Sequence, residues 1–474
     1  MVYLISPSPP VTRRDGHFPS WLFCYQTLVP LNKFVCKLYN VGGVPLHLIP
    51  PYCGRADFLL PLKILLFHPN CVIILYIKHH RHGGSIMYEN FKYLDAVAQK
   101  EITKGVFSGS VLSVIHKGET VYLKSFGLAD KEKNIPMKTD SIFRLFSMSK
   151  PVTAVATMIL IERGLLDTRH LLKWFIPEFS DPVVLDENGE RPADRDITIG
   201  DLLTMTSGIP YPDGTPAGQK MGALWGEQSE KYLKGEKLLD TVSFAKEMGK
   251  RPLMFSPGEK WMYGASADIM GAVIEVVSGM KFGDFLRKEI FEPLGMNDTG
   301  FYIPAEKYSR LAQCYEYKNG GNEPFTHFHL CLTDYTVPPA FESGGAGLVS
   351  TVEDYARFAK MLMNKGELDG VRILGRNTVD FMTRNGLTPE QRKTLNWDST
   401  KGHGYGNFMR ILDDPSTAGL IQSEGSFGWD GWMGCYFSLD PKEQLCILYF
   451  IQQTGAGTTD SARRLQNIAW GAVK

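Results

Sequence analysis

A serine and a lysine three residues apart, Ser147 and Lys150, are the residues of this 474-residue chain whose types and spacing point most directly to chemistry. In a helix, two residues at this spacing lie on the same face, so their side chains can meet. A neutral lysine can take the proton of a serine hydroxyl, and a charged lysine can hold a nearby phenolate. The pair therefore predicts a serine nucleophile with a basic neighbour.

Pro151 follows the lysine directly and limits where the helix can begin. Proline lacks an N–H group and is tolerated in the first turn of a helix, so the helix must begin only a few residues upstream. Ser147 is therefore expected at a helix N-terminus, where free N–H groups and the helix dipole favour a developing oxyanion. The same spacing recurs at 243–246 and 278–281, but neither repeat has a proline-marked start.

The sequence around Ser147 resembles the serine β-lactamase and penicillin-binding superfamily, and within it class C β-lactamases and the related family VIII carboxylesterases. The likeness covers about residues 105–455, and it is carried by separate blocks that occur in family order. These blocks are FRLFSMSKP at 143–151, ITIGDLLTMTSG at 197–208, SPGEKWMY at 256–263, PLGMNDTG at 293–300 and GGAGLVST at 344–351. The resemblance implies a mixed α+β fold of the β-lactamase/transpeptidase type.

The resemblance also implies catalytic roles for three side chains. Ser147 is the nucleophile, Lys150 lies beside it, and Tyr263 matches the family tyrosine that follows a Pro-Gly stretch. A tyrosine acts as a base only if its pKa of about 10 is lowered. A nearby Lys150 ammonium group would lower that pKa by favouring the phenolate.

The stretch that matches the Lys-Thr-Gly strand of β-lactamases reads Trp429-Asp430-Gly431-Trp432. Gly431 would let this strand approach the substrate closely. The resemblance implies an oxyanion hole formed by the backbone N–H groups of Ser147 and Trp432. It implies a substrate-binding role for Trp429, Asp430 and Gly431.

Two departures from the class C pattern bear on the substrate. The asparagine of the Tyr-x-Asn motif is replaced by Ala265, and the lysine of the strand is replaced by Trp429. That lysine helps hold the carboxylate of a penicillin, and loss of a charged donor to a buried partner costs about 2–5 kcal/mol. An adjacent Asp430 is expected to add repulsion. These departures favour hydrolysis of carboxylic esters with short to medium acyl chains, through an acyl-enzyme on Ser147.

Several alternatives remain open at this point. The chain is also compatible with a class C-type β-lactamase, or with a D-alanyl-D-alanine carboxypeptidase or D-aminopeptidase in which Arg410 replaces the missing cation. An acyltransferase would use the same site, because it differs only in admitting an alcohol instead of water. A catalytically silent scaffold is disfavoured, since Ser147, Lys150 and Tyr263 are all present.

Other catalytic classes lack their sequence signals. No Gly-x-Ser-x-Gly elbow occurs, and the histidines have no His-x-x-x-His spacing, so neither an α/β-hydrolase triad nor a metal site is expected. His403 is interpreted as a loop residue without a catalytic role. No cofactor is expected. Lys+Arg and Asp+Glu both number 51, which gives no electrostatic footprint for nucleic acid, so the expected partner is a small ester or β-lactam.

The first 86 residues differ in composition from the rest of the chain. They hold eight Lys/Arg and only two Asp/Glu, together with half of the eight cysteines. Their best apolar run, 58–77, is interrupted by Pro61, Lys63 and a His-Pro-Asn cluster, which makes it a poor membrane span. We predict an atypical, poorly ordered N-terminal extension at 1–86. Without a clean signal peptide, the expected location is the cytoplasm.

The remaining residues, 87–474, are predicted to form one serine hydrolase domain. Strand-like patterns lie near both of its ends and helical patterns fill its middle. This order predicts one antiparallel sheet built from about 87–145 and 340–474, with a mostly helical insertion at about 150–340. Residues 210–235, which are rich in glycine and proline, are expected to form a long loop.

Overall fold

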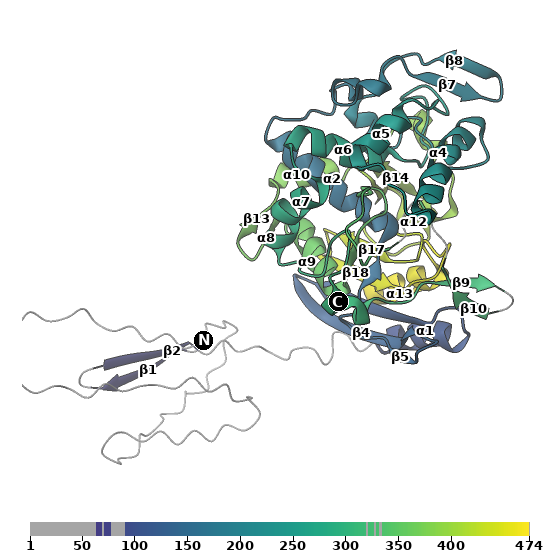
Figure 1. Ribbon diagram of the computed structural model, residues 1–474. Coiled ribbons are helices and arrows are strands. Elements are labelled where there is room, and N and C mark those ends of the chain that lie inside the picture. The colour runs from purple at the N-terminus through teal and green to yellow at the C-terminus, as the bar shows by residue number, and fades with distance from the viewer. Residues whose placement is uncertain are drawn as a thin grey trace, which may run out of the picture. The chain divides into compact units, whose positions relative to one another are not determined.

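The computed structural model describes residues 63–68, 71–76, 91–318, 321–326, 329–330 and 334–473. The chain divides into two compact units, Met1–Gly83 and Gly84–Lys474. The described part of the first unit is one antiparallel hairpin of β1 (Lys63–His68) and β2 (Cys71–Tyr76) (Figure 1). The rest of the predicted extension, with its expected low order, lies outside the described residues. Among the described residues, no helix is long and apolar enough to cross a membrane.

The second unit is built on an eight-stranded antiparallel sheet with the strand order β14-β15-β16-β17-β18-β3-β4-β5. Strands β3 and β18 pair in its interior, with Ser113 opposite Leu448, so the two ends of the unit meet there. This sheet confirms the predicted fold class. Its strands are β3 (Gly109–His116), β4 (Glu119–Asp130), β5 (Ile135–Pro136), β14 (His403–Gly406), β15 (Met409–Leu412), β16 (Phe427–Asp430), β17 (Tyr436–Asp440) and β18 (Leu445–Phe450).

Both faces of the sheet are covered, and the alternation along β18 shows how. Ile447 and Tyr449 belong to one apolar cluster and Leu448 and Phe450 to another, because successive side chains point to opposite faces. The first cluster includes the terminal helices α1 (Lys92–Thr103) and α13 (Asp460–Gly471), which pack against each other. The second cluster includes α9 (Val352–Met363), which lies on β3, β17 and β18.

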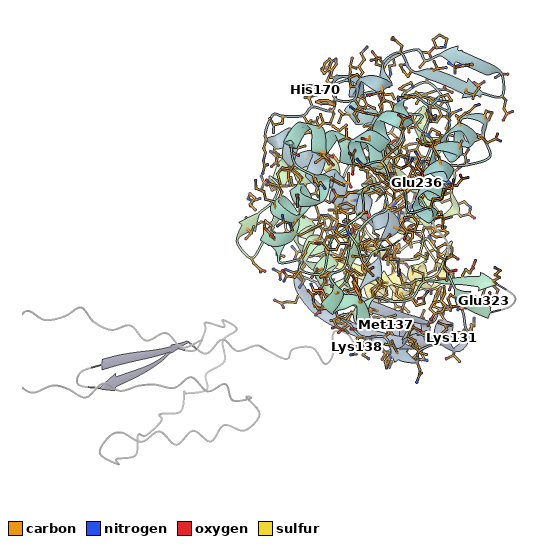
Figure 2. All side chains as sticks on the ribbon, viewed as in Figure 1. Lys131, Met137, Lys138, His170, Glu236 and Glu323 are labelled. Carbon is orange, nitrogen blue, oxygen red and sulfur yellow. The ribbon has the colours of Figure 1, made fainter. Side chains whose placement is uncertain are left out.

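A helical layer occupies the middle of the sequence, as predicted, and its central helix is α2 (Ser149–Glu162). Nearly every residue of α2 is buried, which places it inside the layer rather than on the surface. The other helices are α3 (Ile199–Leu203), α4 (Pro216–Leu233), α5 (Thr241–Gly249), α6 (Ser266–Ser278), α7 (Phe282–Leu286) and α8 (Glu292–Leu294). Side chains fill the space between this layer and the sheet (Figure 2). His170 lies at one end of the unit and Lys138 lies at the other end.

The expectation of a long loop at 210–235 is wrong, because α4 occupies most of this segment. Thr215 caps the helix by accepting a hydrogen bond from Gly218 N at 3.1 Å, and Pro216 stands at the first helical position, where it is well tolerated. Gly222 and Gly226 lower the helix propensity, but tertiary packing outweighs that cost. The buried face repeats every three to four residues and consists of Ala217, Gly218, Met221, Leu224, Trp225 and Gln228.

The turn after β17 is organised by Asp440, a fully buried carboxylate. Its two oxygens accept hydrogen bonds from the backbone N–H groups of Ser423, Lys442 and Glu443 at 2.9–3.1 Å. A fourth bond, from Trp470 Nε1 at 2.9 Å, ties α13 to the sheet. The side chain of Asp440 therefore joins the hairpin of β17 and β18, the segment that precedes β16, and the terminal helix α13.

We expect Asp440→Ala to lower the free energy of unfolding by about 2–4 kcal/mol, because one buried and three part-buried donors lose a charged acceptor. Asp460→Ala is the matched control, since this carboxylate opens α13 with its side chain 86% exposed. The control is expected to change stability by less than about 1 kcal/mol. Denaturant unfolding followed by circular dichroism measures both variants, and equal losses would contradict the role given to Asp440.

Candidate active site

Ser147 lies in a single 3₁₀ turn, Phe146–Met148, which leads directly into α2. Pro151 falls in the first turn of α2, so the predicted position of Ser147 at a helix N-terminus is confirmed. Phe146 has a φ of +47°, a left-handed conformation that is strained for a bulky residue. The backbone thus makes a sharp bend immediately before the predicted nucleophile.

The bend is held by the segment that contains the GGAGLVST block. Leu145 N donates to Leu348 O at 2.9 Å, and Leu348 N donates to Ser149 Oγ at 3.0 Å. The short strands β6 (Phe143–Arg144) and β11 (Val349–Ser350) pair just before and after these bonds. The residues on both sides of Ser147 are therefore fixed to a segment 200 positions away in the sequence.

Lys150 is fully buried, and its Nζ lies 3.1 Å from Ser147 Oγ. The same nitrogen donates to Gly345 O at 2.7 Å and to Tyr211 Oη at 3.3 Å. Burial lowers the pKa of Lys150 to about 7, although the charges of Asp268 and Asp430 oppose the shift. Near neutral pH, much of this amine is uncharged and positioned to accept the proton of Ser147.

Tyr263 lies against both predicted partners. Its hydroxyl accepts a hydrogen bond from Trp429 Nε1 at 3.2 Å, and Lys150 Nζ lies 4.6 Å from the centre of its ring. Burial raises the pKa of Tyr263, and hydrogen bonds with Ser147 and Trp429 offset this only in part. The expectation that Lys150 lowers the pKa of Tyr263 is therefore wrong, because burial removes charge from the lysine and also disfavours the phenolate.

Tyr211 and Asp268 extend the site and were missed in the sequence. Tyr211 Oη donates to Asp268 Oδ2 at 2.9 Å, so a chain of contacts runs from Ser147 through Lys150 to a carboxylate in the first turn of α6. Asp268 Oδ1 accepts bonds from Gly345 N at 3.1 Å and from Ser343 Oγ. The sequence signal that could have identified Asp268 is the presence of an aspartate within the mostly apolar helical pattern of 266–278.

A close approach explains the glycine at 345. A Cβ atom there would lie 2.5 Å from Tyr211 Oη and 2.6 Å from Asp268 Oδ2. Any larger residue would push these groups apart or move the carbonyl that accepts from Lys150. The double glycine of the GGAGLVST block is thus part of the lysine's environment.

The end of β16 packs tightly against the turn of Ser147. A Cβ atom at Gly431 would lie 2.2 Å from Leu145 O, so only glycine fits between the two segments. The ring of Trp432 packs on Phe146 with centroids 5.4 Å apart, and it stacks on His329 at 3.8 Å. The sequence stretch 429–432 is thereby brought beside Ser147, where the resemblance places it.

Asp430 does not present an uncompensated charge to the cleft. Its Oδ2 accepts bonds from Arg410 Nη1 and from Thr458 Oγ1, each at 2.5 Å. The Arg410 guanidinium is buried and lies over the rings of Trp429 and Tyr436. Arg410 therefore compensates the charge of Asp430, and the repulsion expected between Asp430 and a substrate carboxylate stays a prediction. Arg410 is held within the protein by this ion pair rather than presented as a carboxylate anchor.

His403 begins β14, and its Nδ1 lies 2.8 Å from Lys401 O. Burial lowers its pKa to about 4, so the ring is neutral at physiological pH. The interpretation of His403 as a loop residue is therefore wrong, and its lack of a catalytic role stays a prediction. Ala265, which stands where class C enzymes have asparagine, is fully buried at the start of α6.

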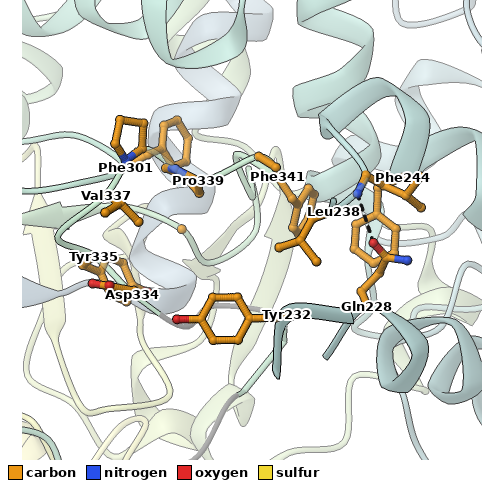
Figure 3. A pocket seen from close by; sticks show the side chains of 14 residues that line it. Gln228, Tyr232, Leu238, Phe244, Phe301, Asp334, Tyr335, Val337, Pro339 and Phe341 are labelled. Carbon is orange, nitrogen blue, oxygen red and sulfur yellow. Dashed lines mark hydrogen bonds between the residues drawn. The ribbon is translucent and has the colours of Figure 1, made fainter. Parts of the chain in front are cut away.

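An apolar pocket of about 110 Å³ opens elsewhere, between α4, α5 and the segment 334–341 (Figure 3). Its walls include Val337 and Phe341, and none of the predicted site residues lines it. Trp225 separates it from the lysine, with ring centroids 5.9 Å from Phe341 and 6.2 Å from Tyr211. The pocket is therefore distinct from the place where Ser147 and Tyr263 meet.

Comparison with known proteins agrees with this geometry. The family model described as Beta-lactamase matches residues 94–469. Esterase EstB of Burkholderia gladioli is 30% identical over 374 residues, covering 75% of this chain and 88% of EstB. The lovastatin esterase of Penicillium rubens is 29% identical over 395 residues, covering 76% and 92%. The solved structure of EstCE1, "a hydrolase with promiscuous acyltransferase activity", matches 82% of this chain and all of its own at 25% identity, with a TM-score of 0.68.

The pKa of Lys150 gives an expected pH dependence. If the neutral amine accepts the proton of Ser147, kcat/KM for a neutral ester should rise with pH through a midpoint near 7 and then level off. Initial rates between pH 5 and 9, corrected for spontaneous hydrolysis, measure this profile. A midpoint near 10, the value of an exposed lysine, would contradict the assignment.

Tyr211 acts through Lys150 and is assigned as a positioning residue. We expect Tyr211→Phe to lower kcat about 10- to 100-fold with little change in KM, because the lysine loses the link that orients it. The midpoint of the pH profile should also move down, since the charged amine loses a polar neighbour. Tyr308→Phe is the control, because this exposed hydroxyl donates only to Thr336 O far from the site. An unshifted midpoint would argue for a merely structural role.

Proposed function

The chain belongs to the beta-lactamase family and is a serine hydrolase, and we propose that it cleaves carboxylic esters of small molecules through an acyl-enzyme on Ser147. The observation that carries the proposal is the buried Lys150 amine, 3.1 Å from Ser147 Oγ, with a pKa lowered to about 7. Such an amine can deprotonate a serine hydroxyl without help from a histidine. We further propose that residues 87–474 carry the activity.

In the first step, Ser147 Oγ attacks the ester carbonyl carbon and its proton passes to Lys150. The carbonyl oxygen becomes an oxyanion, which the backbone N–H groups of Ser147 and Trp432 would hold. Tyr263, kept protonated by its raised pKa, gives its proton to the departing alkoxide as the ester C–O bond breaks. The alcohol therefore leaves with the proton of Tyr263, and the proton that Lys150 took from Ser147 then restores Tyr263.

In the second step, a water molecule attacks the carbonyl carbon of the acyl-enzyme. The same groups act in reverse: a proton of the water passes to the Tyr263 and Lys150 pair, and Ser147 Oγ recovers a proton as its bond to the acyl carbon breaks. The products are a carboxylic acid and the unchanged enzyme. Each cycle thus consumes one ester and one water molecule.

The strand beside Ser147 supports an uncharged ester rather than a penicillin. Trp429 stands where β-lactamases have a lysine, and its indole N–H is directed to Tyr263. Arg410, the cation behind this strand, is already paired with Asp430. A substrate carboxylate would therefore find no free cation at this strand and would lose hydration without compensation.

A second candidate function is acyl transfer to an alcohol, since the acyl-enzyme is common to both reactions. Tyr263 lies among aromatic rings, with Trp429 centred 5.6 Å and the partly exposed Trp397 5.1 Å from its own ring. Such a surface favours the apolar part of an alcohol, whereas water gains nothing from it. EstCE1, a hydrolase with promiscuous acyltransferase activity, has the same fold at 25% identity.

The test compares the full-length wild type with Ser147→Ala and Tyr263→Phe on p-nitrophenyl butyrate, ethyl butyrate and a chromogenic cephalosporin. Wild type should turn over the esters faster than the cephalosporin, and Ser147→Ala should lose the ester activity. Tyr263→Phe should lower kcat/KM for ethyl butyrate about 10²- to 10⁴-fold, because its alkoxide needs a proton. The loss should be smaller for p-nitrophenyl butyrate, whose phenolate leaves unprotonated.

Mass spectrometry of the quenched reaction should show one butyryl group on the peptide that contains Ser147. Faster turnover of the cephalosporin than of either ester would contradict the ester assignment. Equal losses on both esters in Tyr263→Phe would instead show that Tyr263 does not serve as the acid for the leaving group.

A further inference from the structure

Trp397 combines two properties that single it out on the surface. It is 39% exposed, and its ring packs edge to face on Tyr263 with centroids 5.1 Å apart. It also contacts Trp261, at 5.2 Å between centroids. One part of this indole therefore contacts Tyr263, while another part is exposed to solvent.

The segment that carries Trp397 is firmly attached to the chain around Tyr263. It follows α11 (Pro389–Arg392), and Gln391 Nε2 donates to Gly258 O at 2.8 Å. Thr394 Oγ1 accepts a bond from Trp261 N at 2.9 Å. Both bonds come from residues that precede Trp397 and join them to the SPGEKWMY block, so the indole is held beside Tyr263.

The charges nearest to Trp397 are compensated among themselves. Asp398, its neighbour in the sequence, pairs with Lys401 at 2.7 Å, and Glu390 pairs with Lys393 at 2.7 Å. These four charges near Trp397 in the sequence are therefore paired, and the indole offers a ligand a partly exposed aromatic surface. Such a surface suits a flat, uncharged group better than a carboxylate or an ammonium group.

We propose that Trp397 determines specificity for the alcohol part of the substrate by providing an aromatic surface for ring-containing alcohols. The inference rests on the proposed function, in which Tyr263 gives a proton to the departing alkoxide. The alcohol must therefore lie next to Tyr263, and the exposed indole that packs on Tyr263 is positioned to touch it. In acyl transfer, the acceptor alcohol occupies the same place, because it attacks along the path by which the first alcohol leaves.

The transfer of the acyl group from Ser147 to an alcohol needs no further reactant. Benzyl alcohol would attack the carbonyl carbon of the Ser147 ester, and its hydroxyl proton would pass to the Tyr263 and Lys150 pair. The bond between Ser147 Oγ and the acyl carbon then breaks, and Ser147 regains a proton. Trp397 takes no part in these transfers and only binds the alcohol's ring.

The experiment compares kcat/KM of the full-length protein for benzyl butyrate and ethyl butyrate, two esters that share one acyl group and release alkyl alcohols. The wild type should favour the benzyl ester. In Trp397→Ala the benzyl-to-ethyl ratio should fall about tenfold, which corresponds to about 1.4 kcal/mol of lost transition-state binding. Trp397→Phe should keep most of the preference, and Trp397→Leu should give an intermediate ratio.

Two controls separate alcohol recognition from a general effect. Trp174→Ala removes another exposed tryptophan, 61% exposed and packed on His170, and should leave the ratio unchanged. In Trp397→Ala, the ratio of benzyl acetate to benzyl butyrate should also stay unchanged, because the acyl part lies elsewhere. With p-nitrophenyl butyrate as donor, the yield of benzyl butyrate relative to ethyl butyrate should fall in the same variant.

An equal loss on every ester in Trp397→Ala and Trp397→Phe would overturn the inference and leave Trp397 with a structural role beside Tyr263. A wild-type ratio close to one would also overturn it. The proposed function fails separately, and visibly, if wild type hydrolyses no ester or if Ser147→Ala remains active.

Discussion

The burial of the Lys150 amine is the constraint on which the rest of the site depends. A lysine in water is charged at neutral pH and has no use as a base, whereas this amine is fully buried and its pKa falls to about 7. The buried nitrogen keeps hydrogen-bond partners, because Gly345 O and Tyr211 Oη accept from it. The carboxylate of Asp268 is bonded to Tyr211 and not directly to Lys150. Its charge therefore reduces the downward shift of the Lys150 pKa without abolishing it.

This environment explains why the site needs the sheet as well as the helices. Gly345 belongs to the segment that holds the bend at Ser147, and Gly431 belongs to the end of β16, where only glycine fits against Leu145 O. β16 reaches that place because the C-terminal strands join β3 in one antiparallel sheet. The pairing of the two ends of the domain is therefore what closes the site around the lysine.

The features that the sequence predicted well are those set by local rules. Pro151 placed Ser147 at a helix start, and strand-like patterns near both ends of the domain predicted the sheet, because both signals act within a few residues. The features it missed depend on distant partners. Gly222 and Gly226 concealed α4, whose stability comes from packing. The contact of Tyr211 with Asp268, the ion pair of Arg410 with Asp430 and the raised pKa of Tyr263 are all consequences of burial, which spacing alone does not reveal.

Replacement of a cation by aromatic rings at the strand has consequences for both steps of the proposed reaction. Without a free cation, a charged substrate would lose its anchor, while the exposed part of Trp397 offers apolar surface beside Tyr263. The ring of an alcohol gains from that surface and water does not, so the surface that selects the ester's alcohol also improves the position of an alcohol as acyl acceptor. Hydrolysis and transfer then differ mainly in how long the alcohol remains beside Tyr263 before water takes its place. In the proposed reactions, the balance between hydrolysis and acyl transfer would therefore depend on Trp397, and Lys150 would serve both reactions unchanged.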